Sequence, residues 1–357
     1  MGVNRASPLA RFLLTAYVLL VIYATLYPFA GWRDHGAMAF DYLSGGWPRY
    51  FTRFDVAANV LAYLPLGGLV VLALYPRLRG WAAMAGALAC GAALTLVLEA
   101  AQTFLPARVS SNLDVVCNLA GTLLGALLGV RLAHWLLETG PLQRLRESYV
   151  LPGAVADAGL VLLALWIATQ LDPTTLLFGA GDLRDLLRQV EGGAHAADVF
   201  VNIEAWTAGC NLLAVGLAAS AILTPQAPQR LLLLGLLLGA LAAKTAAFAI
   251  LRQADDVLVW LTPGAMIGLA TGVPLLLALC GLPRSLRLAL SALLLMAATV
   301  LVNLAPPNPY FANTLKVWAQ GHFLNFNGLT HLLSSVWPFA AIVYVVFLAT
   351  RGAKMAP

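Results

Sequence analysis

Ionisable and amide side chains gather where one long apolar stretch ends and the next begins. Glu99 and Gln102 are three residues apart, and Asp114 and Asn118 are four apart. On a helix this spacing places each pair on one face, and Arg108 stands in the polar segment between them. Carboxylates, a guanidinium and amides at one depth suit the binding of a polar headgroup, a phosphate or a sugar. They also suit acid–base chemistry, provided that Glu99 holds a proton near neutral pH.

Two further apolar stretches bring polar residues to the same level. Asp55 and Asn59, four residues apart, open the second stretch, and Tyr27 closes the first. Two interpretations stay open at this point. In one, the cluster is a structural hydrogen-bond network, in which Glu99 pairs with Arg108 or stays protonated because an unpaired buried carboxylate is costly. In the other, the same residues form a binding or reaction site.

The four cysteines add no metal ligands and no disulfide to this chemistry. Each stands alone in an apolar run, without a CxxC spacing or a nearby histidine: Cys90, Cys117, Cys210 and Cys280. Isolated cysteines of this kind are typical of small core residues. The chain also lacks a Ser-His-Asp set, an HExxH motif and a phosphate-binding loop. We therefore expect no metal and no other cofactor.

The elements that position these residues must lie in a membrane. Of the 357 residues, 61% are hydrophobic and only 10% are charged, and the mean hydropathy is +0.83. Soluble chains carry roughly 25% charged residues, so this composition argues against a soluble enzyme, a nucleic-acid-binding domain and a disordered protein. The isoelectric point near 9.2 fits basic loops on the cytoplasmic side of a membrane rather than a nucleic-acid partner.

Ten apolar stretches approach the length of about 20 residues that crosses a bilayer as a helix. They cover residues 9–29, 56–75, 81–104, 115–137, 153–171, 205–223, 231–251, 257–279, 286–304 and 332–349. With a cytoplasmic N-terminus, every cytoplasmic loop is net positive, and only one outer loop is. The sequence therefore predicts an all-α, polytopic bundle of about ten transmembrane helices with both termini cytoplasmic.

A stripe of glycines spaced four apart occurs twice, in the fourth and the eighth apolar stretch. The two stripes are Gly121, Gly125, Gly129 and Gly264, Gly268, Gly272. Such stripes allow two helices to approach closely. Asn59 near the start of the second stretch similarly has a counterpart, Asn211, in the sixth. Together these recurring patterns predict a parallel repeat of a four-helix unit.

The repeat divides the chain into three predicted parts. Residues 1–140 form the first four-helix unit, residues 150–280 a degenerate second unit, and residues 281–357 two additional helices with an outer aromatic loop. In the second unit Lys244 stands near the position of Glu99, whereas apolar residues replace Asp114 and Asn118. We therefore expect a structural role for the second unit, with residues 252–256 offsetting the charge of Lys244.

The polar positions of the first unit form an ordered set that resembles the VanZ-like family. The set runs Asn59-x3-Tyr63-x-Pro65-Leu66-Gly67, then Glu99-x2-Gln102, Arg108 and Asp114-x3-Asn118-x2-Gly121-x3-Gly125. The resemblance covers roughly residues 10–135 and includes the Tyr27-Pro28-Phe29 ending of the first stretch. It implies a small polytopic bacterial membrane unit with a role in the cell envelope. The founding member of that family is associated with low-level resistance to the glycopeptide teicoplanin, but the resemblance supplies no reaction.

Three classes of function are compatible with these residues. The first is an envelope protein in the bacterial cytoplasmic membrane, with an outward-facing polar pocket that binds a lipid-linked or cell-wall-related headgroup. The second is a membrane-embedded hydrolase or transferase for a lipid or cell-wall precursor, with Glu99 and Asp114 as acid and base. The third is a transporter or flippase, which the position of the polar groups near one surface disfavours, since transporters bind at the bilayer midplane. The expected partner is a membrane lipid or a lipid-linked envelope precursor, and the sequence predicts no oligomeric state.

Overall fold

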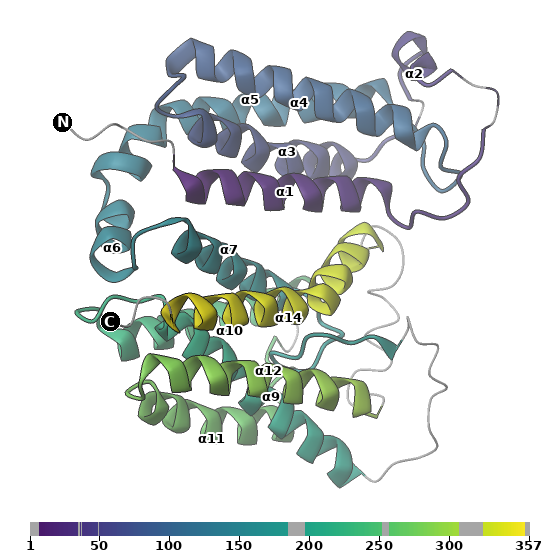
Figure 1. The fold of residues 1–357 in the computed structure, drawn as a ribbon. Coiled ribbons are helices and arrows are strands. Elements are labelled where there is room, and N and C mark those ends of the chain that lie inside the picture. Colours follow the sequence, from purple (N-terminus) through teal and green to yellow (C-terminus); the bar gives the residue numbers. More distant parts are fainter. Residues whose placement is uncertain are drawn as a thin grey trace. The chain divides into compact units, whose positions relative to one another are not determined.

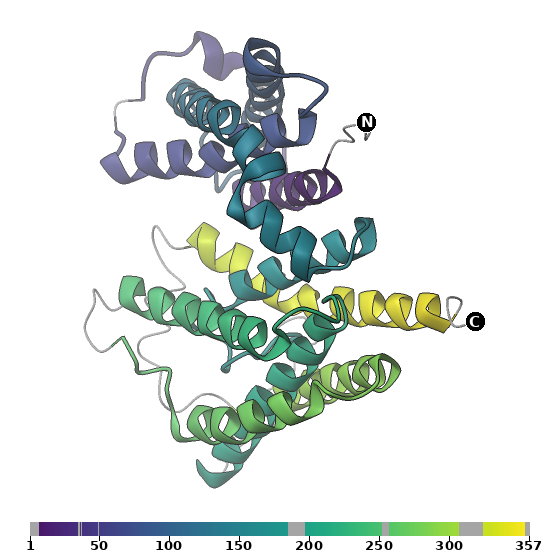
Figure 2. The same cartoon turned by 90° about the vertical axis from the view of Figure 1, so that its left-hand side faces the viewer.

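The chain divides into two compact helical units. The computed structural model describes residues 7–34, 36, 38–48, 50–184, 197–251, 257–306 and 324–353. Unit 1 is Met1–Glu147 and unit 2 is Ser148–Pro357, and each has its own buried apolar core (Figures 1 and 2). The second and third predicted parts thus both fall within unit 2, while the repeat that separated them stays a prediction.

Unit 1 is built around α3, which packs against α1, α4 and α5. Its elements are α1 (Pro8–Leu26), α2 (Asp41–Ser44), α3 (Arg53–Leu74), α4 (Gly80–Gln102), α5 (Asn112–His134), the π-helix η1 (Trp135–Thr139) and α6 (Pro141–Tyr149). Hydroxyl side chains start three of these helices: Ser7 caps α1, Thr52 caps α3 and Ser111 caps α5. Each cap satisfies a backbone N–H that the first helical turn leaves without an internal partner.

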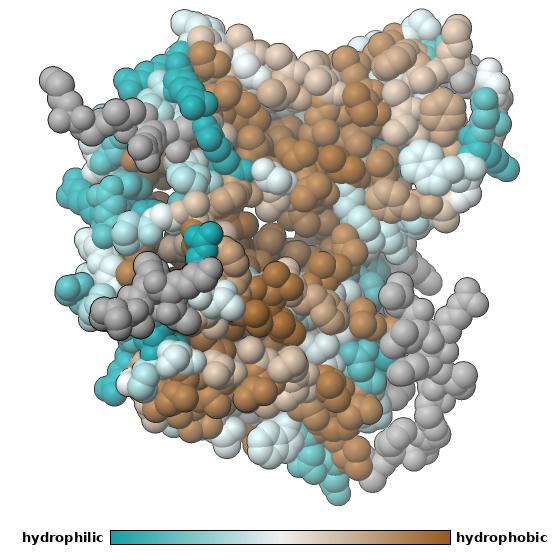
Figure 3. Space-filling model, viewed as in Figure 1, coloured by the Kyte–Doolittle hydropathy of each residue, from teal (hydrophilic) through white to brown (hydrophobic). Residues whose placement is uncertain are grey.

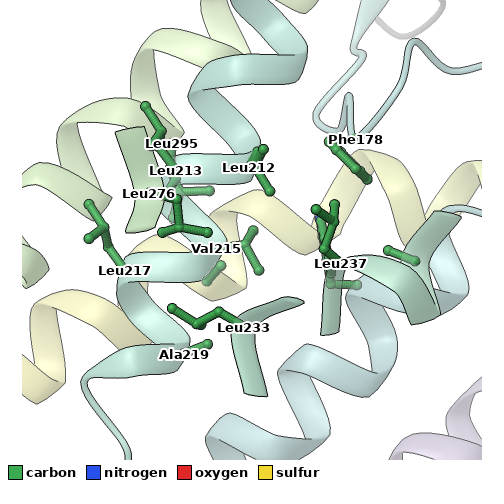
Figure 4. Packing of buried hydrophobic residues seen from close by; sticks show 14 of the residues in the cluster. Phe178, Leu212, Leu213, Val215, Leu217, Ala219, Leu233, Leu237, Leu276 and Leu295 are labelled. Atoms are coloured by element: carbon green, nitrogen blue, oxygen red, sulfur yellow. The ribbon is translucent and has the colours of Figure 1, made fainter. Parts of the chain in front are cut away.

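Unit 2 is centred on α9, which packs against α11 and α12, while α14 packs against α7 and α12. Its helices are α7 (Ala154–Thr169), α9 (Ala197–Ser220), α10 (Gln229–Leu251), α11 (Pro263–Leu279), α12 (Arg284–Leu304) and α14 (Leu324–Ala353). Figure 4 shows Leu213 and Leu217 of α9 beside Leu276 of α11 and Leu295 of α12. These side chains form the apolar core that holds α9 in place.

The fold class predicted from the sequence is confirmed. Each of the ten predicted spans coincides with a helix in the described part of the chain. Eight of these helices are long and apolar enough to cross a membrane, and two, α7 and α11, are shorter. Figure 3 shows hydrophobic residues along the helices of each unit and hydrophilic residues near the helix ends, as a lipid-facing surface requires. The chain is a multi-pass membrane protein.

The starts of three helices differ clearly from the prediction: α9 and α14 each begin eight residues earlier, and α11 begins six residues later. The apolar run begins at Val257, but α11 begins at Pro263 and has 17 residues. The side chain of Thr262 accepts a hydrogen bond from the N–H of Ala265 and so caps the helix. Proline is favoured in the first turn because it lacks the N–H that would there have no partner. The Thr-Pro signal therefore outweighs the hydrophobicity of the preceding residues.

The glycine stripe of α5 lies directly against the backbone of α3. A Cβ atom on Gly121 would lie 2.3 Å from the carbonyl oxygen of Val60, and one on Gly125 would lie 1.8 Å from that of Leu64. No side chain tolerates such distances, so the glycines are required for the two helices to cross here. This seam fixes the register between α3 and α5.

The same packing recurs between α9 and α11 in unit 2. A Cβ atom on Gly264 would lie 2.7 Å from the carbonyl oxygen of Val201, and one on Gly268 would lie 2.8 Å from that of Ala205. One constant shift in residue number relates Val60 to Val201 and Leu64 to Ala205, which supports a repeat of this helix pair. With that shift in residue number, Asn59 corresponds to Phe200. The contacts therefore do not support the prediction that Asn211 is the counterpart of Asn59 in the repeat. The repeat of a full four-helix unit stays a prediction.

Candidate functional site

The buried carboxylate of Glu99 holds the loop between α4 and α5. Its side chain is 3% exposed, and one of its oxygens accepts a hydrogen bond from the backbone N–H of Ser111 at 2.9 Å. The backbone carbonyl of Glu99 accepts from the hydroxyls of Ser110, at 2.8 Å, and Thr103, at 3.3 Å. Ser111 in turn caps α5. One acidic residue thus fixes the end of α4 and the start of α5 together.

Two side chains connect this loop to the end of α1. The guanidinium of Arg108 donates to the carbonyl oxygen of Tyr27 through Nε at 3.0 Å and through a second, shorter bond, and also to that of Ala24 at 3.5 Å. The amide of Gln102 donates to the carbonyl oxygen of Thr25 at 3.1 Å. Burial lowers the pKa of Arg108 from its ordinary value. The carbonyl dipoles at the end of α1 stabilise its charged form.

The first turns of α3 and α5 carry two half-buried carboxylates. Asp114 accepts a hydrogen bond from the amide of Asn59 at 2.7 Å, which joins the two helices. Asp55 forms a capping box with Thr52, whose backbone N–H donates to the carboxylate at 2.9 Å. Asp114 is close enough to both Asp55 and Glu99 for their charges to interact. Three carboxylates from three helices therefore lie near one another.

Asn118 extends the cluster deeper into unit 1. Its side chain is 4% exposed, and its amide donates to the hydroxyl of Thr95 at 2.9 Å. The hydroxyl of Tyr63 lies close enough to Thr95 to interact with it. Among the described residues, the amide oxygen of Asn118 has no hydrogen-bond partner. This oxygen is an acceptor that a ligand or a water molecule can use.

Comparison with known proteins finds a family that is similar to the part of the chain containing this cluster. Residues 12–134 match the family model VanZ/LLP1. This part of the chain is similar to the VanZ-like family, and we refer to it as the VanZ-like unit. The match includes all the candidate site residues: Tyr27, Asp55, Asn59, Glu99, Gln102, Arg108, Asp114 and Asn118. No curated protein and no solved structure matches the chain.

The structure brings the candidate residues of the VanZ-like unit to one level. Asn59 and Asn118 lie in the second turns of α3 and α5, and the others lie in the last or first turns of α1, α3, α4 and α5 or in the loops that join them. The hydrogen bonds described for Glu99 and Arg108 go to Ser111 and to the α1 carbonyls and do not join the two residues, which was one of the two alternatives of the structural interpretation. The other alternative, a protonated Glu99, stays a prediction. Tyr27 contributes its backbone carbonyl. Its ring lies beside that of Tyr23, at a centroid distance of 5.8 Å.

Sequence analysis missed the hydroxyl side chains that complete this cluster. Thr95 is four residues before Glu99 and therefore lies on the same face of α4. That spacing was the available signal for Thr95. Ser110 and Ser111 carried a weaker signal, because serine commonly caps helices whether or not a site is near. Among the described residues, there is no group of three His, Cys, Asp or Glu side chains that could hold a metal ion.

Proposed function

We propose that the VanZ-like unit binds the polar headgroup of a lipid-linked or cell-wall-related ligand. The site would lie at the ends of α1, α3, α4 and α5, on the outer face of a bacterial cytoplasmic membrane. The observation that carries the proposal is the carboxylate cluster of Glu99, Asp114 and Asp55, which comes from three helices. Charged groups at this depth are costly in a membrane protein, and their retention is typical of a functional site.

The chemistry of the cluster favours a ligand that donates hydrogen bonds. Ionised carboxylates are acceptors only, and the amide oxygen of Asn118 adds a further acceptor. The guanidinium of Arg108 is already bonded to carbonyl oxygens of α1, which reduces its capacity for a phosphate. Hydroxyl groups of a sugar, or an amine of a phospholipid headgroup, therefore fit the cluster better than a phosphate does.

A membrane-embedded hydrolase or transferase is the second candidate. One observation favours it: Glu99 is 3% exposed, whereas its neighbour Asp114 is half-buried and accepts a bond from Asn59. Two neighbouring carboxyl groups in different surroundings are a recurrent arrangement of a general acid and a general base. In that case the bound headgroup would be the substrate.

Glu99→Gln and Asp114→Asn test the binding proposal because they remove charge without removing an acceptor. An amide oxygen still accepts from the N–H of Ser111 in the first variant and from Asn59 in the second. We expect both proteins to fold. We expect the amount of co-purifying lipid, measured by mass spectrometry, to be at least tenfold lower in each variant than in the wild type. Glu147→Gln, an exposed carboxylate on α6 that accepts from Gln143, is the matched control and should retain the lipid.

The same measurement separates binding from catalysis. Equal lipid content in the wild type and in both site variants would refute the headgroup proposal. If the Glu99→Gln protein instead retains an intact headgroup lipid that the wild type converts, the enzymatic candidate is correct. Variants that fail to fold despite the retained acceptors would favour a structural network.

A further inference from the structure

Unit 2 contains a separate buried group of charges. Lys244 on α10 is 1% exposed, Glu204 on α9 is 2% exposed, and Asp172, which follows α7, is fully buried. The ammonium of Lys244 donates to the carbonyl oxygens of Asp172, at 2.7 Å, and Thr175, at 2.9 Å, and its Nζ lies 3.3 Å from the Thr175 hydroxyl. The loop after α7 thus folds over the end of this lysine.

The charges of this group do not balance. Both carboxylates are close enough to Lys244 for their charges to interact, so two negative groups face one positive group. Among the described residues, Asp172 Oδ2 and Glu204 Oε2 have no hydrogen-bond partner. An uncompensated charge in a membrane interior is very costly. Within the part of the chain that the structure describes, this group therefore lacks one positive charge when it is buried.

A hydroxyl beside Glu204 is also without a partner. Thr207 is three residues further along α9, on the same face, and its hydroxyl has no hydrogen-bond partner among the described residues. Several other helical threonines instead bond to a carbonyl one turn earlier, as Thr245 does with Leu241 at 2.8 Å and Thr122 does with Asn118 at 2.8 Å. The Thr207 hydroxyl is thus available to accept a hydrogen bond from a neighbouring acid.

A cavity lies beside Thr175, which binds Lys244, although Lys244, Glu204 and Asp172 themselves do not line it. Its volume is about 150 Å³, and Thr174, Thr175 and Phe200 contribute to its lining. Thr175 is also a partner of Lys244, and Phe200 is one helical turn before Glu204. The cavity has the size and the polar groups needed to hold several water molecules. Water in this cavity would lie next to Thr175, one residue away from the ammonium of Lys244.

We propose that unit 2 binds one exchangeable proton on the carboxylate pair of Asp172 and Glu204, with the cavity beside Thr175 as its entrance. A water molecule in the cavity transfers the proton, an O–H bond forms on one carboxylate oxygen, and release reverses both steps. The resulting acid is neutral and donates a hydrogen bond to one of the acceptors that otherwise has no partner. The nearby ammonium of Lys244 disfavours a metal cation at the same place.

The surrounding groups are consistent with a single proton. Beyond the three charged residues themselves, the hydroxyl of Thr262, which caps α11, lies close enough to Glu204 to interact with it. On the cavity side, Asp182 and Arg184 form an ion pair at 2.6 Å, and His331 on α14 lies close enough to Asp182 to interact with it. The pair is neutral as a whole, so it leaves the deficit of one positive charge unchanged. This proposal does not depend on headgroup binding by unit 1.

Infrared difference spectroscopy of the full chain in lipid nanodiscs tests the proposal through a count of protonated carboxyl groups. The wild type minus Glu204→Gln and the wild type minus Asp172→Asn should each show one carboxylic-acid band, which shifts in heavy water and titrates with pH. In Lys244→Gln the band should double, because two carboxylates then lack a positive partner. Asp198→Asn, an exposed carboxylate on the same helix, is the control and should leave the band unchanged.

Three results would overturn the proposal. The first is a band of full intensity in both carboxylate variants, and the second is a band that does not shift in heavy water. The third is loss of the band on addition of sodium at constant pH, which would assign the site to a metal cation. If the carboxylate variants fail to fold, the heavy-water shift in the wild type and the doubling in Lys244→Gln still decide the question.

Discussion

Backbone groups solvate the buried charges in both units. The carboxylate of Glu99 accepts a hydrogen bond from the N–H of Ser111, and the ammonium of Lys244 donates hydrogen bonds to the carbonyl oxygens of Asp172 and Thr175. Each charge thus meets the backbone dipole of opposite sign in a loop that folds over a helix end. The partners of Lys244 are about 70 residues away in sequence. Sequence analysis instead assigned its neutralisation to residues 252–256, which lie outside the described residues.

Asp182 gives a testable pH dependence at the residue scale. Burial alone would raise the pKa of this carboxyl, but the hydrogen bonds and the charge of Arg184 outweigh burial and lower the pKa below its ordinary value. Asp182 therefore stabilises the folded state above the pKa of an unfolded aspartate, about 3.9, and this contribution is lost as pH falls through the lowered value. Thermal unfolding in detergent should show Asp182→Asn less stable than the wild type at neutral pH.

The difference between the two proteins should shrink as the solution is acidified below about pH 4, where the wild-type carboxyl also becomes protonated. Asp198→Asn, an exposed carboxylate, is the control and should follow the wild-type curve throughout. A constant difference between Asp182→Asn and the wild type across this range would show that the ion pair does not stabilise the fold.

Helix positions were predictable from the sequence, whereas the contacts between helices were only partly so. Long apolar runs are decisive because each must satisfy its backbone hydrogen bonds internally within a membrane. The glycine stripes also indicated close packing, but not which helix they would meet. The contacts that Arg108 and Lys244 make with loops could not be predicted from the sequence, because they depend on how the connecting segments fold. The start of α11 was missed for a local reason, the Thr262 cap.

The α3–α5 seam gives a prediction at the element scale. Alanine normally stabilises a helix relative to glycine by up to about 1 kcal/mol. In Gly125→Ala the new methyl would lie 1.8 Å from the carbonyl oxygen of Leu64, so we expect destabilisation by roughly 1–3 kcal/mol or more. Gly235→Ala on α10 has nothing within 4 Å and should be neutral or stabilising. Reversible unfolding in detergent measures both, and equal effects would show that the seam does not depend on glycine.

Topology is the property that concerns the molecule as a whole. The distribution of loop charges predicts that the α4–α5 loop faces outward and that the segment after α5 is cytoplasmic. In a cysteine-free background, a cysteine at Val109, which is 85% exposed, should react in intact cells with a thiol reagent that cannot cross the membrane. A cysteine at Leu142, beyond the other end of α5, should react only after the membrane is opened. The reverse pattern would place the candidate site in the cytoplasm.

The lysine of α10 has a consequence for how the chain is made. The ribosome synthesises α7 and the loop after it before α10. The carbonyl acceptors of Asp172 and Thr175 therefore reach the membrane before Lys244, which donates hydrogen bonds to them. A lone lysine at the centre of a helix costs roughly 2.5–3.5 kcal/mol on insertion. Acceptors that are already present reduce this cost at the moment of insertion. A permuted chain that began with α10 would present Lys244 to the translocon without these acceptors, so the order of the helices in the gene itself favours correct integration.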